Sequence, residues 1–575
     1  MKVSDYIVSY LERRGVECVF EMSGGMIAHL LDSLQRRGKI RVVSMHHEQG
    51  AAFAADAVGR MTGTPGVAMA TSGPGATNLL TGIGSCYFDS SPAVFITGQV
   101  NRNEQKGERA IRQLGFQETD IVPMAQPITK AAWRVTEAAE VPTLLERAFT
   151  LATAKRPGPV LLDIPMDVQR ADLPVDEIDS AQHEATNDSE VDEESLRALL
   201  DQLETAKRPL ILAGGGLRSA RAIESFRRLV RRLRVPVVNS LMAVDALPHG
   251  DPLRVGMIGS YGNRWANLAI GRADFLLVMG SRLDVRQTGS QTESFKGERA
   301  IFHVDCESGE INNRVTGCRA IVSGLKEFVE AALRASTERE FAERVEWSEE
   351  IEELRRAWPD TTELAEAPGI NPNALMHQLS AVSTGAAAYV VDVGQHQMWA
   401  AQSLELGEEQ RFLTSGGMGS MGFALPAAVG AAFAAPGQPI VLIAGDGGFQ
   451  SNIQELQTIV HHRLPVKMLV VNNNCHGMVR QFQESYFEAR YQSTLWGYSA
   501  PDFAEIAKAY KIPARTIEDE REVEEALRWL WLDSSGPALL QVMVDTYSNA
   551  YPKIAFGSPM TEMEPLAKPT EMEST

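Results

Sequence analysis

The chain has 575 residues, of which 44% are hydrophobic and 22% are charged. This composition is ordinary for a large soluble enzyme, and at roughly 150 residues per domain the length predicts three large domains or four smaller ones. The chain has 55 basic and 74 acidic residues, and its net charge of −19 argues against a nucleic-acid partner. The five cysteines form no Cys-x-x-Cys pair, so we expect no disulfide scaffold or zinc site but a reducing, cytoplasmic location.

We expect neither a targeting segment nor a membrane partner. The first ten residues include Lys2 and Asp5, which the apolar core of a secretory signal would not contain. The longest apolar run, residues 422–436, is rich in alanine and interrupted by Pro426. It is too short to span a membrane and predicts a buried helix instead.

Two polar stretches divide the chain. Residues 180–195 are acidic, and residues 335–372 are charged and then rich in proline and asparagine. Both are typical of linkers, and the second predicts a solvated helix within it. They separate three domains and a C-terminal tail, at residues 1–180, 190–345, 365–550 and 551–575. The apolar residues Ile554, Ala555 and Phe556 favour docking of this tail over a trailing end.

Short apolar runs alternate with helical patterns in every domain. Buried strands are predicted in the first and last domains by the runs at residues 67–70, 93–96, 160–164, 440–444, 468–471 and 538–542. Strands that alternate with helices predict an α/β fold with three domains, each a mainly parallel sheet flanked by helices. Residues 71–76 and 414–419 are also similar glycine-rich turns, which suggests that the first and last domains are related.

The strongest chemical signal lies in the last domain. The predicted strand at residues 440–444 ends in the sequence Gly-Asp-Gly-Gly, and the strand at residues 468–471 ends in three asparagines. Carboxyl ends of parallel strands share one edge of a sheet, where glycines and a helix N-terminus favour a phosphate group. Carboxylate and amide oxygens at such an edge are the ligands that Mg²⁺ prefers. Two unrelated turns would be the alternative, but the spacing of the two motifs argues against it.

The second signal is the sequence His-His-Glu-Gln-Gly-Ala-Ala-Phe-Ala-Ala-Asp at residues 46–56. A lone glutamate at a helix start, here Glu48, ordinarily just complements the helix dipole. The small side chains that follow Glu48 would shield its carboxylate from water, which suits proton transfer.

Together these motifs resemble the signature of thiamine-diphosphate enzymes. From residue 1 to about residue 550, the chain is similar to catalytic large subunits of the acetohydroxyacid (acetolactate) synthase family. The resemblance implies decarboxylation of pyruvate and transfer of the two-carbon acetyl unit to a second 2-oxo acid, as in branched-chain amino acid biosynthesis. It also implies a homodimer or homotetramer whose active sites lie at the dimer interface, with Glu48 and Asp446 from different subunits. A small regulatory subunit is a further partner of this family.

The resemblance also implies how the cofactor and Mg²⁺ are held. Asp446, Asn473 and the carbonyl of Cys475 would bind Mg²⁺. Glu48 would be catalytic, because it would share a proton with the pyrimidine N1′ and so favour the tautomer that removes the thiazolium C2 proton. The side chain of Met421 and the carbonyl of Gly419 would hold the cofactor in its bent form. Other cofactor-binding residues would be Gly394, Gln395, His396, Gln397, Gly445, Gly447, Gly448 and Met478.

FAD is expected in the middle domain. Glycines at residues 214–216, Arg282 after an apolar run, and Asp305 suit an ADP-like ligand. The resembled synthases bind FAD there, although their reaction needs no redox step. Residues 239–242 and 306–309 depart from the family pattern, so a domain with a decayed nucleotide site is the alternative.

Substrate residues follow the family less closely. Gln117 and Lys130 match catalytic positions, and substrate contacts are implied for Gly25, Met26, Phe116, Arg286 and Phe482. The family usually has alanine in place of Met26 and tryptophan in place of Phe482, so the acceptor preference is open.

Several alternatives follow from these departures. One is a specialised carboligase that uses another ketone or aldehyde, such as a sugar intermediate, and another is an enzyme like sulfoacetaldehyde acetyltransferase. A catalytically silent paralogue is disfavoured because Glu48, Asp446 and Asn473 are intact. Residues 417–422 also fit the dinucleotide fingerprint G-x-G-x-x-G, but residues 411–414 before them predict a poor strand, which disfavours a nicotinamide enzyme.

Overall fold

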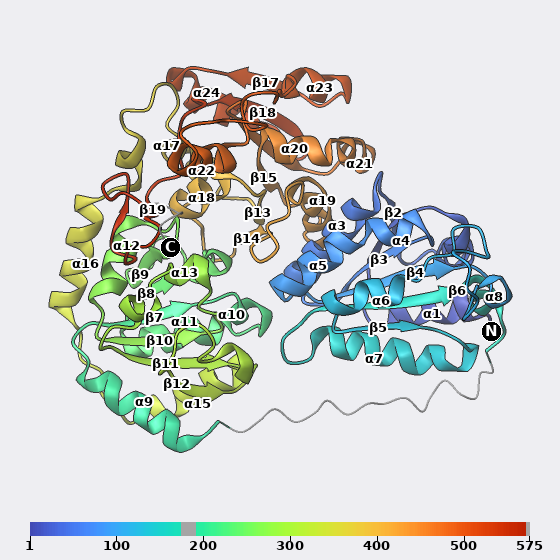
Figure 1. Cartoon of the computed structure of the whole chain (residues 1–575), viewed down its shortest axis with the longest axis horizontal. Helices are drawn as coiled ribbons and strands as arrows, with labels where there is room; N and C mark the ends of the chain where they lie inside the picture. The colour runs from blue at the N-terminus through green and yellow to red at the C-terminus, as the bar shows by residue number, and fades with distance from the viewer. Residues whose placement is uncertain (174–190, 571–575) are drawn as a thin grey trace.

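The computed structural model describes residues 1–173 and 191–570 (Figure 1). It contains three six-stranded sheets, and every strand pair within them is parallel. Helices flank each sheet, which confirms the α/β fold with three domains (Figure 1). All six predicted strands of the first and last domains are formed. Across the described ranges no helix has the length and apolar character needed to cross a membrane.

The first sheet has the order β2-β1-β3-β4-β6-β5. Its strands, in this spatial order, are β2 (Arg41–Ser44), β1 (Cys18–Met22), β3 (Gly66–Ala70), β4 (Ala93–Gln99), β6 (Pro159–Pro165) and β5 (Ala131–Arg134). The helices around it include α1 (Val3–Arg13), α2 (Ala28–Arg37), α3 (Glu48–Thr62), α4 (Pro74–Asn78), α5 (Leu80–Asp89), α6 (Ile121–Ala125), α7 (Val141–Thr153) and α8 (Met166–Arg170).

The last sheet has the order β14-β13-β15-β16-β18-β17. Its strands are β14 (Arg411–Thr414), β13 (Ala388–Val391), β15 (Ile440–Gly445), β16 (Val466–Asn472), β18 (Ala538–Met543) and β17 (Ala514–Ile517). When the strands are numbered from the start of each domain, this order is the same as that of the first sheet. The agreement supports the predicted relation between the two domains. Its helices include α17 (Pro372–Val382), α18 (Gln395–Ser403), α19 (Ala424–Ala434), α20 (Asp446–Ser451), α21 (Leu456–His462), α22 (Gly477–Tyr486), α23 (Phe503–Ala509) and α24 (Val523–Leu530). Because β14 is a regular strand, the expectation of a poor strand at residues 411–414 is wrong.

The middle sheet has a different order, β12-β11-β10-β7-β8-β9. Its strands are β12 (Arg319–Val322), β11 (Ala300–Asp305), β10 (Phe275–Met279), β7 (Pro209–Ala213), β8 (Val237–Asn239) and β9 (Arg254–Met257), and its helices include α9 (Glu193–Thr205), α11 (Ile223–Leu233), α12 (Arg264–Arg272) and α15 (Leu325–Ser336). Counted within its own domain, this is the strand order of dinucleotide-binding folds. In such folds the ligand lies where the order reverses, here between β7 and β10.

Two helices of small residues join the first and last domains, and they lie side by side in Figure 1. α3 and α19 are almost entirely buried, which confirms the buried helix predicted for residues 422–436. A Cβ added to Gly430 of α19 would lie 2.8 Å from the Cα of Ala54 in α3, so the backbones touch. Phe53 and Phe423 close the contact, with ring centroids 5.4 Å apart. This packing brings Glu48, the first residue of α3, to the edge of the last domain.

The two predicted linkers have different outcomes. The boundaries at residues 180 and 190 lie outside the described residues. Within the second linker, α16 (Val345–Ala357) forms as a helix, but Trp347, Ile351 and Leu354 are buried. Trp347 donates from its indole nitrogen to the carbonyl of Pro209, 3.1 Å away. The expectation of a solvated helix is therefore wrong for one face, which covers the middle domain.

The C-terminal tail docks on the middle domain (Figure 1). Ile554, Met560 and Met563 join its hydrophobic core. β19 (Lys553–Ile554) and β20 (Met563–Glu564) pair in an antiparallel hairpin. Arg264 of α12 donates to the carbonyl of Glu564, 3.1 Å away, so the apolar residues of the tail predicted its docking correctly.

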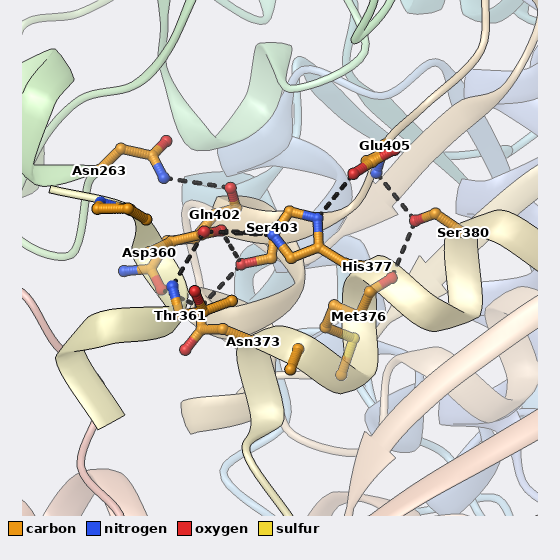
Figure 2. A network of polar contacts seen from close by, with 12 residues as sticks. Asn263, Asp360, Thr361, Asn373, Met376, His377, Ser380, Gln402, Ser403 and Glu405 are labelled. Carbon is orange, nitrogen blue, oxygen red and sulfur yellow. Dashed lines mark hydrogen bonds and ion pairs between the residues drawn. The ribbon is translucent and has the colours of Figure 1, made fainter. Parts of the chain in front are cut away.

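A polar network fastens the second linker to the last domain (Figure 2). The His377 ring lies between two carboxylates, with Nδ1 2.8 Å from Glu405 and Nε2 3.0 Å from Asp360. Ser403 of α18 also donates to Asp360, and Asn373 donates to Ser403 over 2.8 Å. The start of the last domain is thus tied to α18, which borders the candidate site.

Candidate active site

Asp446 and Asn473 meet at one edge of the last sheet. β15 and β16 pair with Gly445 opposite Val471, so the residues that follow both strands emerge together. The Asp446 side chain is 3% exposed, and its Oδ2 has no hydrogen-bond partner within the described parts of the chain. Burial raises the pKa of Asp446 to about 6. A cation beside this oxygen would compensate the buried charge.

The other implied metal ligands, Asn473 and Cys475, follow the neighbouring strand β16. Asn473 donates from Nδ2 to Gln395, 3.1 Å away, and its Oδ1 accepts from the backbone N–H of Cys475 over 3.2 Å. In residues 1–173 and 191–570, no group of three or more His, Cys, Asp or Glu side chains is arranged to hold a metal ion. A carboxylate, an amide and a carbonyl instead offer hard oxygen donors, a set that fits Mg²⁺ better than zinc.

Glycines let side chains pack directly against the backbone of this edge. A Cβ at Gly445 would lie 2.8 Å from the His396 ring, one at Gly447 would lie 2.7 Å from the His476 ring, and one at Gly477 would lie 2.6 Å from Gln395. His396 accepts from the N–H of Gly445 over 3.2 Å, and burial lowers its pKa to about 3, so the ring is neutral. Backbone N–H groups in such a cradle fit a diphosphate.

The loop after β14 is held by a residue that the sequence analysis missed. Asp392 directly follows β13 and accepts from the N–H groups of Gly422 (3.0 Å) and Ala424 (2.8 Å). Burial raises the pKa of Asp392 to about 6. Gly419 and Gly422 have φ of +68° and +80°, values that favour glycine, and the Met421 side chain between them is 40% exposed. An acid directly after an apolar run, as at Asp446, was the signal that could have identified Asp392.

Glu48 is the first residue of α3, and its neighbour Gln49 contacts the last domain. Asn78 donates to its Oε2 over 2.9 Å, and the residue is 7% exposed. The next residue, Gln49, accepts from Asn452 of the last domain (3.1 Å), and Asn452 also donates to the carbonyl of Gly422 (2.8 Å). Gln49 thus contacts the last domain of its own chain, whereas the resemblance implies that Glu48 faces Asp446 of a second subunit.

The residues implied to contact the substrate are spread over several segments of the chain. Phe116 is 80% exposed and Gln117 has φ of +62°. Gly25 and Met26 form a 3-10 turn at the carboxyl end of β1, where Met26 accepts at its carbonyl from Gln169 over 2.7 Å. Phe482 on α22 packs against Tyr486, with centroids 4.8 Å apart.

Lys130 is bound to the backbone. Its Nζ donates to the carbonyls of Ala154 and Arg156, both 2.7 Å away, and burial lowers its pKa to about 8. The hydrogen bonds described for this ammonium therefore hold a loop of the first domain together and do not reach Glu48.

A cavity of about 1160 Å³ opens where the middle domain faces the other two. It lies at the reversal of the middle sheet and includes Gly216 after β7 and Gly280 after β10. Its lining further includes Arg60, Ser281, Arg282, Arg286, Asp305 and Gly417. Arg282 and Arg286 therefore line this cavity together.

The comparisons with known proteins agree with this geometry. Models of thiamine pyrophosphate enzymes match in chain order: the N-terminal TPP binding domain at residues 1–124, the central domain at 196–332 and the C-terminal TPP binding domain at 392–542. The acetolactate synthase large subunit of Parasynechococcus marenigrum is 37% identical, covering 98% of this chain and 91% of that protein. The acetolactate synthase isozyme 1 large subunit of Escherichia coli is 36% identical over 97% of both chains. The acetolactate synthase large subunit of Lactococcus lactis is 34% identical over 97% of this chain and 95% of that protein. The chain therefore belongs to the acetolactate synthase family of thiamine-diphosphate-dependent enzymes.

Proposed function

We propose that the protein decarboxylates pyruvate and transfers the two-carbon acetyl unit to a second 2-oxo acid, as an acetolactate synthase does in branched-chain amino acid biosynthesis. The observation that carries this proposal is the buried, unpartnered oxygen of Asp446 at the shared edge of β15 and β16. Thiamine diphosphate, when bound there, supplies an electron sink for the decarboxylation. The residues of the chain bind and orient the cofactor and exclude water from it.

Asp446, Asn473 and the carbonyl of Cys475 would bind Mg²⁺, and the glycines at residues 445, 447 and 448 would admit the diphosphate. Glu48 would hold a proton against the pyrimidine ring. Asn78 already occupies its Oε2, which leaves Oε1 for that ring. The Gly419 carbonyl and Met421 side chain would set the bend of the cofactor. The small residues of α3 and α19 would exclude water from the Glu48 side.

FAD is the proposed ligand of the middle cavity. Its support is the reversal point of a dinucleotide-type sheet, the adjacent glycines and the two arginines. If FAD binds there, the purified protein should be yellow and release a flavin on denaturation. A colourless protein that takes up no flavin would contradict this part of the proposal.

The identity of the acceptor substrate is tested by an NMR time course with thiamine diphosphate, Mg²⁺, FAD and pyruvate. Sustained formation of acetolactate is expected. Carbon dioxide with acetaldehyde and little acetolactate would instead favour a carboligase for another ketone or aldehyde, for which Met26 and Phe482 are the supporting departures. A requirement for inorganic phosphate would favour the enzyme that resembles sulfoacetaldehyde acetyltransferase.

The assembly belongs to the same proposal. A homodimer or homotetramer in the cytoplasm, with a small regulatory subunit as a further partner, follows from the family. Sedimentation of the purified chain, alone and with a candidate small subunit, would test both points.

A further inference from the structure

We propose that Glu455 of the last domain is a positioning residue for Glu48. The inference rests on the proposed role of Glu48 at the cofactor. Glu455 ends the 3-10 helix η9 (Ile453–Glu455) and is fully buried. Its Oε1 accepts from the backbone N–H of His46 over 2.9 Å, and its Oε2 accepts from the Thr458 hydroxyl over 2.7 Å.

The same carboxylate touches the other side of Glu48. A Cβ at Gly50 would lie 2.9 Å from Glu455 Oε1 and 3.5 Å from Pro426 Cβ. Glu455 therefore contacts the chain two residues before Glu48 and two residues after it. A side chain at Gly50 would therefore crowd this carboxylate.

Two further contacts tie the same segments together. Asn452, three residues before Glu455, donates to Gln49 over 3.1 Å. The His46 ring lies with Nδ1 3.2 Å from the Thr458 hydroxyl, and Nδ1 is 3.7 Å from Glu455. Residues 452–458 of the last domain thus hold residues 46–50 of the first domain through several contacts, with Glu455 at their centre.

Burial of the Glu455 carboxylate costs free energy, which argues that this contact has a function. A carboxylate without a Lys or Arg partner loses its hydration on burial, and here the hydrogen bonds from His46 and Thr458 compensate for part of that loss. Burial raises the pKa of Glu455. Because a catalytic group displaced by 1 Å can cost about 100-fold in rate, a rigid hold on both sides of Glu48 would have a large effect.

The test compares Glu455→Leu with Glu455→Gln in the full-length protein reconstituted with thiamine diphosphate and Mg²⁺. Leucine keeps the size but cannot accept from His46, whereas glutamine keeps the accepting oxygen. The readouts are exchange of the cofactor C2 proton measured by quench NMR, the Kd for the cofactor, and the unfolding temperature. Glu363→Leu is the control, because Glu363 is a buried acid that pairs with Arg264 at another contact (2.5 Å).

We expect Glu455→Leu to slow C2 proton exchange about tenfold or more, with the KM for pyruvate little changed. Glu455→Gln should stay within about threefold of the wild type, because the acceptor for His46 remains. Glu363→Leu should lower the unfolding temperature without slowing exchange. Normal exchange in Glu455→Leu, or equal slowing in all three variants, would overturn the inference.

Two more variants keep the result decisive. If Glu455→Leu does not fold, Gly50→Ala crowds the same carboxylate, and normal exchange in that variant would overturn the inference. Glu48→Gln distinguishes the proposed catalytic role of Glu48 from the positioning role of Glu455. Normal exchange in Glu48→Gln would remove the proposed role of Glu48 itself, whereas slow exchange there with normal exchange in Glu455→Leu would remove only the role of Glu455.

Discussion

The contact between α3 and α19 should be sensitive to a single methyl group at Gly430. An added Cβ would lie 2.7 Å from the carbonyl carbon and 2.8 Å from the Cα of Ala54, whereas ordinary contact begins at 3.4 Å. The carbonyl oxygen of Ala54 would lie closer still, so the helices must separate by more than about 1 Å, and overpacking of this kind costs about 1–3 kcal/mol. Because both contacting groups are backbone, no side chain can rotate away to relieve the clash.

The same separation should weaken the cofactor site, since α3 carries Glu48 and α19 follows Met421. We expect Gly430→Ala to lower the free energy of unfolding by about 1–3 kcal/mol in urea titrations and to weaken cofactor binding by about tenfold. Gly385→Ala is the matched control, because a Cβ at Gly385 has no atom within 4 Å. If Gly430→Ala matched this control in stability and cofactor Kd, the reasoning about the domain contact would be refuted.

Three further predictions address the site and its supports. Glu48→Gln should lower kcat by about 100-fold or more while the protein still binds thiamine diphosphate, and steady-state kinetics with near-normal turnover would contradict it. Asp446→Ala should abolish the rise in unfolding temperature that Mg²⁺ and the cofactor give the wild type, and a chelator should do the same to the wild type; an unchanged rise would exclude Asp446 as a ligand. At His377, burial alone would lower the pKa, but Asp360 and Glu405 raise it overall. Its stabilisation is therefore complete below pH 6.5 and is lost as the pH rises through the raised pKa, so the loss of stability in His377→Gln should be larger near pH 6 than near pH 9; a pH-independent difference in unfolding temperature would argue against this.

Much of the architecture could be read from local patterns. The apolar run that became β15 is hydrophobic on both faces because both faces of a parallel strand are covered. The carboxyl ends of adjacent parallel strands share an edge, so the placement of Asp446 beside Asn473 followed from strand assignment and spacing alone. Alanine-rich composition likewise predicted the buried helix α19, because small side chains allow close packing on all sides.

Local patterns failed where the outcome depended on a distant neighbour. Residues 411–414 are a poor strand by composition, yet they pair with β13 and become β14. The charged helix α16 covers the middle domain, where the indole of Trp347 donates to the carbonyl of Pro209, a residue far away in the chain. The hydrogen bonds of Lys130 to the loop carbonyls of Ala154 and Arg156 likewise depend on a distant segment, and its catalytic role stays a prediction.

The sequence by itself determined the elements, the class of each domain and the chemistry available at the strand ends, because periodicity and turn residues act over a few positions. Only the tertiary structure decided which strand ends and helix ends meet. Glu455 reaches His46, and the middle cavity takes residues from three domains, since such contacts join segments separated by hundreds of residues. Their geometry comes from helix packing between domains, which no local pattern encodes.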